Sequence, residues 1–453
     1  MLTFFIKLSR YIFGDFAEDE FKKFLFMGGI FALIIGVYWT LRPLKDAIFI
    51  QLVDKMHLPY AKTMTVIGLL PLIIIYTKLL EKNSREKMLQ ILPAFYGSVI
   101  LIFGLLMFFL QETISTSVML TILGYAWYLF VESFGSLLVA LFWAFATDVT
   151  EPDSAKRGFP LVVALGQIGG IICPFSVGGL PYRLGYKTDA LSLMLLGLLI
   201  LCIIPLVKYF LKITPKYLLA SFASQNNFTL LQAKPDFLQG LKLILTHKYL
   251  LGIVVVNFAY DLIVTIFDFN FKVAAATQYT GVALSHFLSI YGSSVNILSL
   301  LFLLLGISNI TRYLGIGVAL ATMPVLIGLA LFSFITINSL TFLFILMVSS
   351  KAINYALSEP AIKQLYIPTT SAVRFKAQAW IETFGSRASK GAGSMFNMLL
   401  KPLQMNMGEI AGRAHYIFIC GGLGFPVIIL WFITALYLTK TFAQAVKDKK
   451  IIC

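Results

Sequence analysis

Long apolar runs alternate with short polar connections along the whole chain. Twelve of these runs have about the length that a transmembrane helix requires, roughly 20 residues. The twelve runs predict helices that cross a membrane, and they lie near residues 24–42, 64–80, 89–110, 116–147, 158–179, 190–211, 249–271, 284–306, 312–335, 338–358, 377–399 and 414–439.

Composition places the chain in the same class. Hydrophobic residues make up 59% of the 453 residues and charged residues only 13%, whereas a soluble domain carries about 25% charged residues. The predicted fold is therefore an all-α membrane protein with 12 transmembrane helices.

The twelve predicted spans form two sets of six. A polar segment at 212–247 separates an N-terminal half, 1–211, from a C-terminal half, 248–453, and is expected to be a cytoplasmic linker. Within it, residues 236–246 have the pattern of a short amphipathic helix on the membrane surface.

The two halves share a weak internal similarity. Ser-Ala-Lys-Arg at 154–157 opens the fifth span, Ser-Ala-Val-Arg at 371–374 precedes the eleventh, and glycines follow both. Parallel six-helix repeats around a central cavity are the major-facilitator plan. Close packing of helices explains the glycines equally well.

The formal net charge of +15 has two explanations that are compatible with each other. Basic residues concentrate in the N-terminus, the 81–88 and 148–158 loops, the central segment and the C-terminal tail, and the positive-inside rule then puts both termini in the cytoplasm. The second explanation of the positive charge is a path for an anionic solute through the protein. The N-terminal region mixes acidic and basic residues and does not have the pattern of a signal or transit peptide, which favours a bacterial inner membrane.

The first candidate site is at the end of the first span, where Arg42 and Lys45 flank Pro43. Residues three apart project from one face of a helix, and a proline frees backbone carbonyls. These cations are expected either to face a water-filled cavity or to extend to the membrane interface.

Two acidic residues within predicted spans are further candidates. Glu132 has apolar neighbours and no cation within one helical turn, so its partner is expected on another helix. It fits a proton site, a salt bridge with a substrate-binding lysine, or a structural ion pair. Asp268 lies four residues before Lys272, and the two fit a pair along the seventh span, exposed at the helix end in the simplest interpretation.

The eleventh span contributes Arg387 and Lys390, and Lys390 opens Lys-Gly-Ala-Gly-Ser. The glycines would let a phosphate approach backbone amides, while the lysine supplies a point charge. The chain has no Gly-Lys pair and hence no nucleotide-hydrolysing P-loop, and its scattered cysteines and four isolated histidines indicate no metal, cofactor or disulfide. The chain is not expected to be an enzyme.

Several stretches, in order along nearly the whole chain, resemble the ATP/ADP translocase (nucleotide transporter) family of plastids and obligate intracellular bacteria. They are Leu-Arg-Pro-Leu-Lys-Asp at 41–46, Glu-Ser-Phe-Gly-Ser-Leu-Leu-Val-Ala-Leu-Phe-Trp-Ala-Phe-Ala at 132–146, Ala-Lys-Arg at 155–157, Glu-Pro-Ala-Ile-Lys and Tyr-Ile-Pro within 359–368, and Gly-Ser-Arg-Ala-Ser-Lys-Gly-Ala-Gly-Ser at 385–394. The family's transport residues then fall on Lys45, Glu132, Asp268 and Lys390.

The chain departs from the family pattern in three places. The family's Glu-x-x-Trp-Lys is Asp268-x-x-Phe271-Lys272 here, Phe-Asp-Pro-Thr-Lys-Glu has become Leu-Ser-Glu-Pro-Ala-Ile-Lys-Gln, and Lys390 follows serine instead of glycine. These departures are compatible with a nucleotide transporter. They weaken the implication that the chain strictly exchanges ATP for ADP.

The resemblance and the charged residues together predict an ATP/ADP antiporter that imports ATP by alternating access, with no nucleic-acid partner and as a monomer in the bilayer. Lys45 and Arg42 from one half, and Lys390 and Arg387 from the other, would bind the polyphosphate, and Glu132 and Asp268 would pair with the lysines between substrates. Tyr38, Trp39 and Phe142 are candidates to stack on the purine, with core packing as the alternative. Proton-coupled import of a nucleotide, another anion or a peptide, and a membrane scaffold without transport, remain the alternatives.

Overall fold

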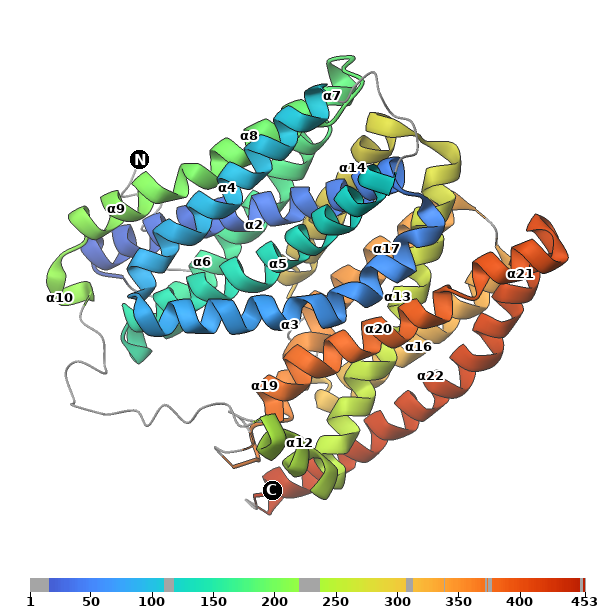
Figure 1. Ribbon diagram of the computed structural model, residues 1–453. Helices are drawn as coiled ribbons and strands as arrows, with labels where there is room; N and C mark the ends of the chain where they lie inside the picture. Colours follow the sequence, from blue (N-terminus) through green and yellow to red (C-terminus); the bar gives the residue numbers. More distant parts are fainter. Residues whose placement is uncertain are drawn as a thin grey trace. The chain divides into compact units, whose positions relative to one another are not determined.

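The computed structural model describes residues 16–109, 118–219, 237–306, 313–337, 339–370, 373, 377–448 and 451–452 (Figure 1). All regular structure within these ranges is helical, and eleven stretches there are long and apolar enough to cross a membrane. The all-α, multi-pass membrane fold expected from the sequence is confirmed.

The helices of the N-terminal half follow the predicted order. They are α2 (Glu18–Leu52), the 3-10 turn η1 (Lys55–His57), α3 (Leu58–Lys82), α4 (Arg85–Phe109), α5 (Val118–Asp148), α6 (Pro152–Cys173), the π-helical segment η3 (Pro174–Gly178), α7 (Leu180–Arg183), α8 (Ala190–Leu201), α9 (Ile203–Ile213) and α10 (Lys216–Leu219).

The C-terminal half begins with the amphipathic helix expected near 236–246. Its helices are α12 (Phe237–Thr246), α13 (Lys248–Gln278), α14 (Gly281–Leu304), α16 (Ile316–Thr336), α17 (Leu340–Ile353), the π-helical segment η5 (Asn354–Ser358), α18 (Glu359–Gln364), α19 (Gln378–Trp380), the π-helical segment η7 (Ile381–Gly385), α20 (Ser386–Asn397), α21 (Leu400–Met407) and α22 (Glu409–Lys447).

The first span is longer than the apolar run that predicted it. Acidic residues at Glu18, Asp19 and Glu20 favour the start of α2, because they complement the positive end of the helix dipole. The helix then continues through Pro43 to Leu52, so the charged residues expected near its end lie well inside it.

The span predicted near 377–399 differs from the other eleven. It consists of α19, η7 and α20, and α20 is rich in serine, glycine and cations, so it does not have the apolar character of a lone membrane helix. Two of the π-helical segments lie beside charged residues of this half, because η5 is followed by Glu359 and η7 contains Glu382. Such segments are frequent at functional sites.

Contacts group the chain into two compact units. Unit 1 takes its described residues from 16–54, 68–219 and 279–297, and unit 2 takes them from 55–67, 237–278 and 298–452, with the gaps given above. Helices α3 and α14 each contribute to both units, so neither unit coincides with one half of the sequence.

Unit 1 packs tightly around α2, which lies against α6 and α5. A methyl group added at Gly169 of α6 would lie 2.1 Å from the carbonyl oxygen of Ala32, so only glycine permits this approach of the two backbones. Phe103 and Trp127 stack at 4.1 Å between α4 and α5. The first turns of α14 also belong here, and Ser285 donates a hydrogen bond of 2.6 Å to the fully buried Asp189.

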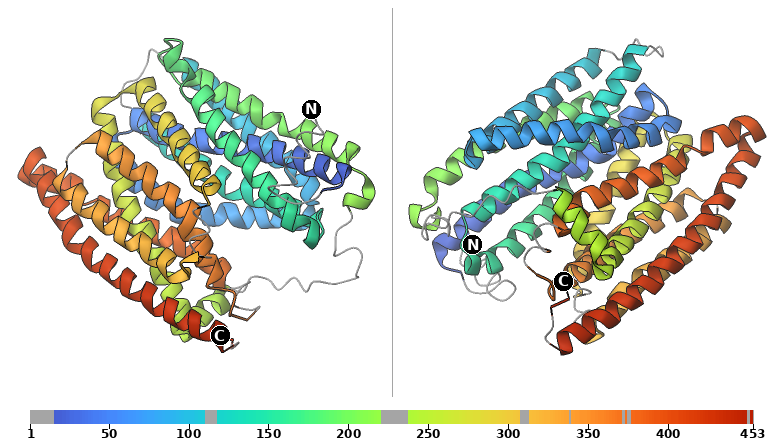
Figure 2. Two further views of the ribbon diagram at one scale, coloured as in Figure 1. Left: turned by 180° about the vertical axis from the view of Figure 1, so that it is seen from behind. Right: turned by 60° about the horizontal axis from the view of Figure 1, so that its bottom comes forward.

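Unit 2 is built around α13, which contacts α17, α20 and α22. Helix α22, red in both views of Figure 2, runs along α16 and α21. A buried polar chain connects three of these elements, because Asn270 donates to the Tyr416 hydroxyl at 3.2 Å, Tyr416 donates to Asn397 at 2.6 Å, and Asn397 donates to the carbonyl oxygen of Thr265 at 3.2 Å. These bonds fix α13 and α20 beside each other.

Candidate functional site

In unit 1, Lys45 of α2 forms an ion pair with Glu132 of α5. The lysine side chain is 4% exposed and the glutamate side chain 35% exposed, so a buried cation meets a partly solvated anion. The Lys45 ammonium also lies 3.9 Å from the centre of the Tyr128 ring and 3.8 Å from a carboxylate oxygen of Asp46. Lys45 is therefore the partner on another helix that the sequence predicts for Glu132.

Arg42 lies one turn before Lys45 and is half-buried. Its guanidinium group stacks over the Trp39 ring at 5.4 Å, and Trp39 in turn contacts the edge of Tyr38. Phe142, the third aromatic candidate, is completely buried and stacks on Phe31 at 4.6 Å. Core packing therefore accounts for Phe142, whereas Tyr38 keeps partial exposure.

In unit 2, Asp268 of α13 is surrounded by lysines. Its carboxylate lies 2.5 Å from the Lys272 ammonium, 3.2 Å from that of Lys351 on α17, and 3.5 Å from that of Lys62 on α3. The Asp268, Lys272 and Lys351 side chains are 9%, 13% and 8% exposed. The pair of Asp268 and Lys272 is therefore part of a buried cluster and not an exposed pair at a helix end.

Lys62 and Lys351 were not singled out from the sequence. Lys351 did leave a signal, since it is a lone cation in the apolar run of α17, where an ionisable residue usually marks a pathway. Lys62 gave no such signal, because it lies beside the connection between the first two spans and far from Asp268 in sequence.

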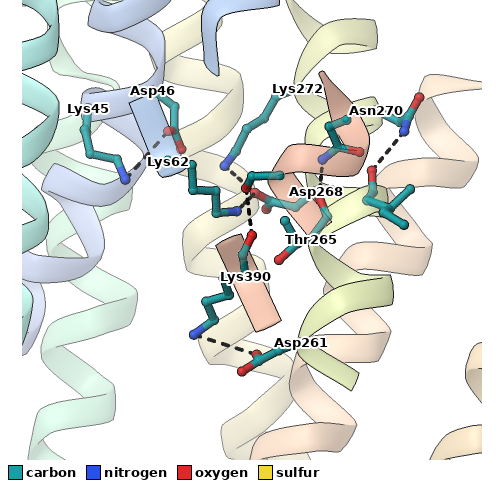
Figure 3. Close-up of polar contacts among 12 residues, drawn as sticks. Lys45, Asp46, Lys62, Asp261, Thr265, Asp268, Asn270, Lys272 and Lys390 are labelled. Atoms are coloured by element: carbon teal, nitrogen blue, oxygen red, sulfur yellow. Dashed lines mark hydrogen bonds and ion pairs between the residues drawn. The ribbon is translucent and has the colours of Figure 1, made fainter. Parts of the chain in front are cut away.

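A second charged cluster lies seven residues before Asp268 on α13. Asp261 accepts a hydrogen bond of 2.5 Å from Ser386, and its other carboxylate oxygen lies 3.7 Å from the Lys390 ammonium of α20 (Figure 3). The Lys390 side chain is 45% exposed, which makes it the most accessible lysine of the two clusters. Arg387, one turn earlier on α20, is half-buried.

Other charged groups border the second cluster. Glu359, the first residue of α18, accepts a hydrogen bond of 3.3 Å from Asn354 in η5. Glu382 in η7 accepts one of 2.8 Å from Gln378. No group of three or more histidine, cysteine, aspartate or glutamate side chains suited to a metal ion occurs among the residues that the structure describes.

These clusters can bind anions. A lysine ammonium donates strong, charge-assisted hydrogen bonds to a phosphate, and in each cluster a carboxylate occupies the position that such an oxygen would take. Each lysine lies on a helix, and its ammonium group is positioned by the carboxylate that it contacts.

Comparison with known proteins agrees with this chemistry. The model of the TLC ATP/ADP transporter family matches residues 2–123 and 115–442. The "ADP,ATP carrier protein 1" sequences of Rickettsia typhi and Rickettsia prowazekii are each 23% identical over 97% of this chain and 97% of their own length. The "Plastidic ATP/ADP-transporter" of Solanum tuberosum is 23% identical over 95% of this chain and 74% of its own length.

Solved structures share the fold at low identity. A crystal structure of the nucleoside transporter NupG superposes with a TM-score of 0.64 at 14% identity, covering 91% of this chain and 98% of that one. The peptide transporter POT in complex with sulfate gives 0.59 at 11% identity, covering 91% and 95%. The fold is therefore that of major-facilitator-like transporters, and by the extent of the family match the chain belongs to the TLC ATP/ADP transporter family.

Proposed function

We propose that this protein exchanges ATP for ADP across a bacterial inner membrane by alternating access. Family membership and the printed names of the rickettsial and plastid relatives support an adenine-nucleotide substrate. The observation that carries the proposal is the cluster of Lys62, Lys272 and Lys351 around Asp268, inside a membrane protein.

Ionised side chains inside a membrane are costly and usually mark a substrate pathway. Each one within a membrane segment costs at least about 2.5 kcal/mol on the insertion scale. The three ammonium groups around Asp268 are suited to bind a polyphosphate, because each donates charge-assisted hydrogen bonds. The Lys45 and Glu132 pair offers unit 1 the same exchange of a carboxylate for a phosphate.

The carboxylates then act as substitutes for the substrate. When a phosphate enters, it binds the lysines and Glu132 or Asp268 becomes exposed to water. When the phosphate leaves, the ion pair forms again. A ligand shifts a conformational equilibrium only through its different affinity for the two states, and this competition provides such a difference.

Uptake of labelled ATP into proteoliposomes tests the proposal. We expect internal ADP to stimulate uptake strongly and an uncoupler to leave that stimulation unchanged. Uptake that ignores internal ADP and collapses with the uncoupler would instead establish proton-coupled import, with Glu132 as the first proton site to examine. Absence of nucleotide binding would leave the scaffold interpretation.

We also propose that both termini face the cytoplasm, that the segment 212–247 is a cytoplasmic linker between the halves 1–211 and 248–453, and that the protein works as a monomer. The basic loops support this orientation. Single cysteines introduced into loops and labelled from either side of the membrane test it, and light scattering of the purified protein tests its mass.

A further inference from the structure

The Lys45 ammonium lies over the face of an aromatic ring. It is 3.9 Å from the centre of the Tyr128 ring, and the two side chains come from different helices, α2 and α5. Tyr128 is 2% exposed and the Lys45 side chain is 4% exposed, so the contact is shielded from water. An ammonium group in this position is attracted by the negative potential of the ring face, and the attraction is stronger where water is excluded.

The ring and the carboxylate that share this lysine lie one turn apart on α5. Tyr128 and Glu132 are four residues apart and therefore lie on the same side of the helix. The Glu132 side chain is 35% exposed, whereas Tyr128 is buried. Lys45 thus has a charged partner at the edge of the solvent and a neutral partner in the core.

Packing around Phe49 holds the Tyr128 ring in place. Phe49 is 0% exposed, lies four residues after Lys45 on α2, and contacts Tyr128 edge to face with 5.3 Å between the ring centres. A methyl group added at Gly124 of α5 would lie 2.5 Å from the Val53 side chain, so α2 and α5 approach each other closely here. The two helices therefore fix the plane of the ring relative to Lys45.

We propose that Tyr128 is a positioning residue for nucleotide binding, which keeps the Lys45 ammonium in place while Glu132 is exchanged for a phosphate. The inference rests on the proposed function and deepens it, because it adds a neutral side chain to the charged ones. An ammonium group has three N–H donors. The ring face occupies one side of it, and donors remain for the carboxylate or the phosphate. Since the ring carries no net charge, it does not compete with the phosphate.

Positioning matters because the lysine stem is flexible. Without the ring, the pair of Lys45 and Glu132 in the empty protein shifts toward water, where both charges are better solvated. Returning the ammonium to the phosphate then costs free energy, and the affinity for the nucleotide falls. Asp46 does not replace the ring, because its carboxylate oxygen is 3.8 Å from the ammonium, which is too far for a hydrogen bond (Figure 3).

ATP/ADP exchange in proteoliposomes, with fluorinated phenylalanines incorporated at position 128, tests the inference. Fluorine draws electron density away from the ring face and weakens its attraction for a cation, while the shape of the ring changes little. Tyr128→Phe is the reference, and the test variants carry one, two or three fluorine atoms on the same ring. We expect the KM for ATP to rise with each fluorine, to about fivefold for three, which corresponds to about 1 kcal/mol. The maximal rate should change less than twofold.

Two controls separate attraction for the cation from packing. Tyr128→Leu removes the ring and should raise the KM about as much as three fluorine atoms do. The same fluorinated series at Phe145, a 1% exposed residue of α5 whose ring packs against Phe210 at 6.0 Å, should leave the KM unchanged. If Tyr128→Leu does not fold, as judged by gel filtration, the fluorinated variants carry the test because their rings keep the shape of phenylalanine.

The outcomes separate this inference from the proposed function. If the wild type exchanges ATP for ADP but the KM is the same throughout the fluorinated series, Tyr128 only packs in the core, and the exchange function stands. An equal rise of the KM in the Phe145 series also overturns the positioning role, because the effect then belongs to fluorine in the core. A wild type that binds no nucleotide overturns both proposals.

Discussion

Replacing Asp189 by asparagine should make the protein more stable at neutral pH. Asp189 precedes α8, is 0% exposed, and accepts a hydrogen bond from Ser285 on one carboxylate oxygen. Its other oxygen has no donor among the described residues. A carboxylate in such a place is poorly compensated, whereas an asparagine is neutral and still accepts the Ser285 hydroxyl.

The expected size follows from the pKa of Asp189. Burial raises this pKa from 3.8 to about 6, although the hydrogen bond from Ser285 opposes the change. A pKa difference of about 2 corresponds to about 3 kcal/mol. Because the folded protein holds the proton more tightly than the unfolded chain, the stabilisation from protonated Asp189 is complete below about pH 4 and is lost as the pH rises through about 6.

Unfolding of the purified protein in detergent, followed between about pH 4 and pH 7.5, measures this contribution. Other carboxyl groups titrate in the same range, so the informative quantity is the free energy of unfolding of Asp189→Asn minus that of the wild type. We expect this difference to rise with pH by about 3 kcal/mol and then to become constant near neutrality. Asp54→Asn, an exposed acid in the same unit, is the control and should follow the wild type. Parallel curves for Asp189→Asn and the wild type would refute the reasoning.

Three further variants test the packing and the ion pairs. Lys45→Gln should abolish ATP uptake while the protein still reaches the membrane, and wild-type uptake in this variant would exclude Lys45 from the site. Asp268→Asn leaves three lysines without their shared carboxylate and should destabilise the protein by about 3–5 kcal/mol, as judged from unfolding in detergent. Added ATP should restore more stability in this variant than in the wild type, and equal gains would contradict competition between Asp268 and phosphate. Gly169→Ala should cost about 1–3 kcal/mol because the new methyl group meets the carbonyl oxygen of Ala32, whereas Gly29→Ala, with open space around it, should be neutral or slightly stabilising in the same unfolding measurement.

Much of the fold was predictable because a membrane helix can be recognised from its own stretch of sequence. About 20 apolar residues in a row are sufficient evidence for a span, and no knowledge of its neighbours is needed. The segment near 377–399 was the least typical, since α20 contains Arg387, Lys390 and several glycines. It was recognised from its resemblance to a family motif and from its place in the order of spans.

The site was only partly predictable, for a physical reason. Spacing along one helix predicts pairs such as Asp268 and Lys272, which are four residues apart. This spacing does not identify Lys351 and Lys62. They are 83 and 206 residues from Asp268 and contact it only in the folded unit. Glu132 was predictable in part. Its lack of a nearby cation predicted a partner on another helix but did not identify Lys45.

The Asp268 cluster bears on the choice between exchange and one-way import. Its ion pairs with Lys62, Lys272 and Lys351 connect α3, α13 and α17. Under the proposed function a polyphosphate competes with Asp268 for these lysines. The empty protein must then break the ion pairs before it changes conformation, whereas the loaded protein has already exchanged them for phosphate. A carrier whose empty return is slow exchanges one nucleotide for another more readily than it imports one alone, so this competition favours antiport.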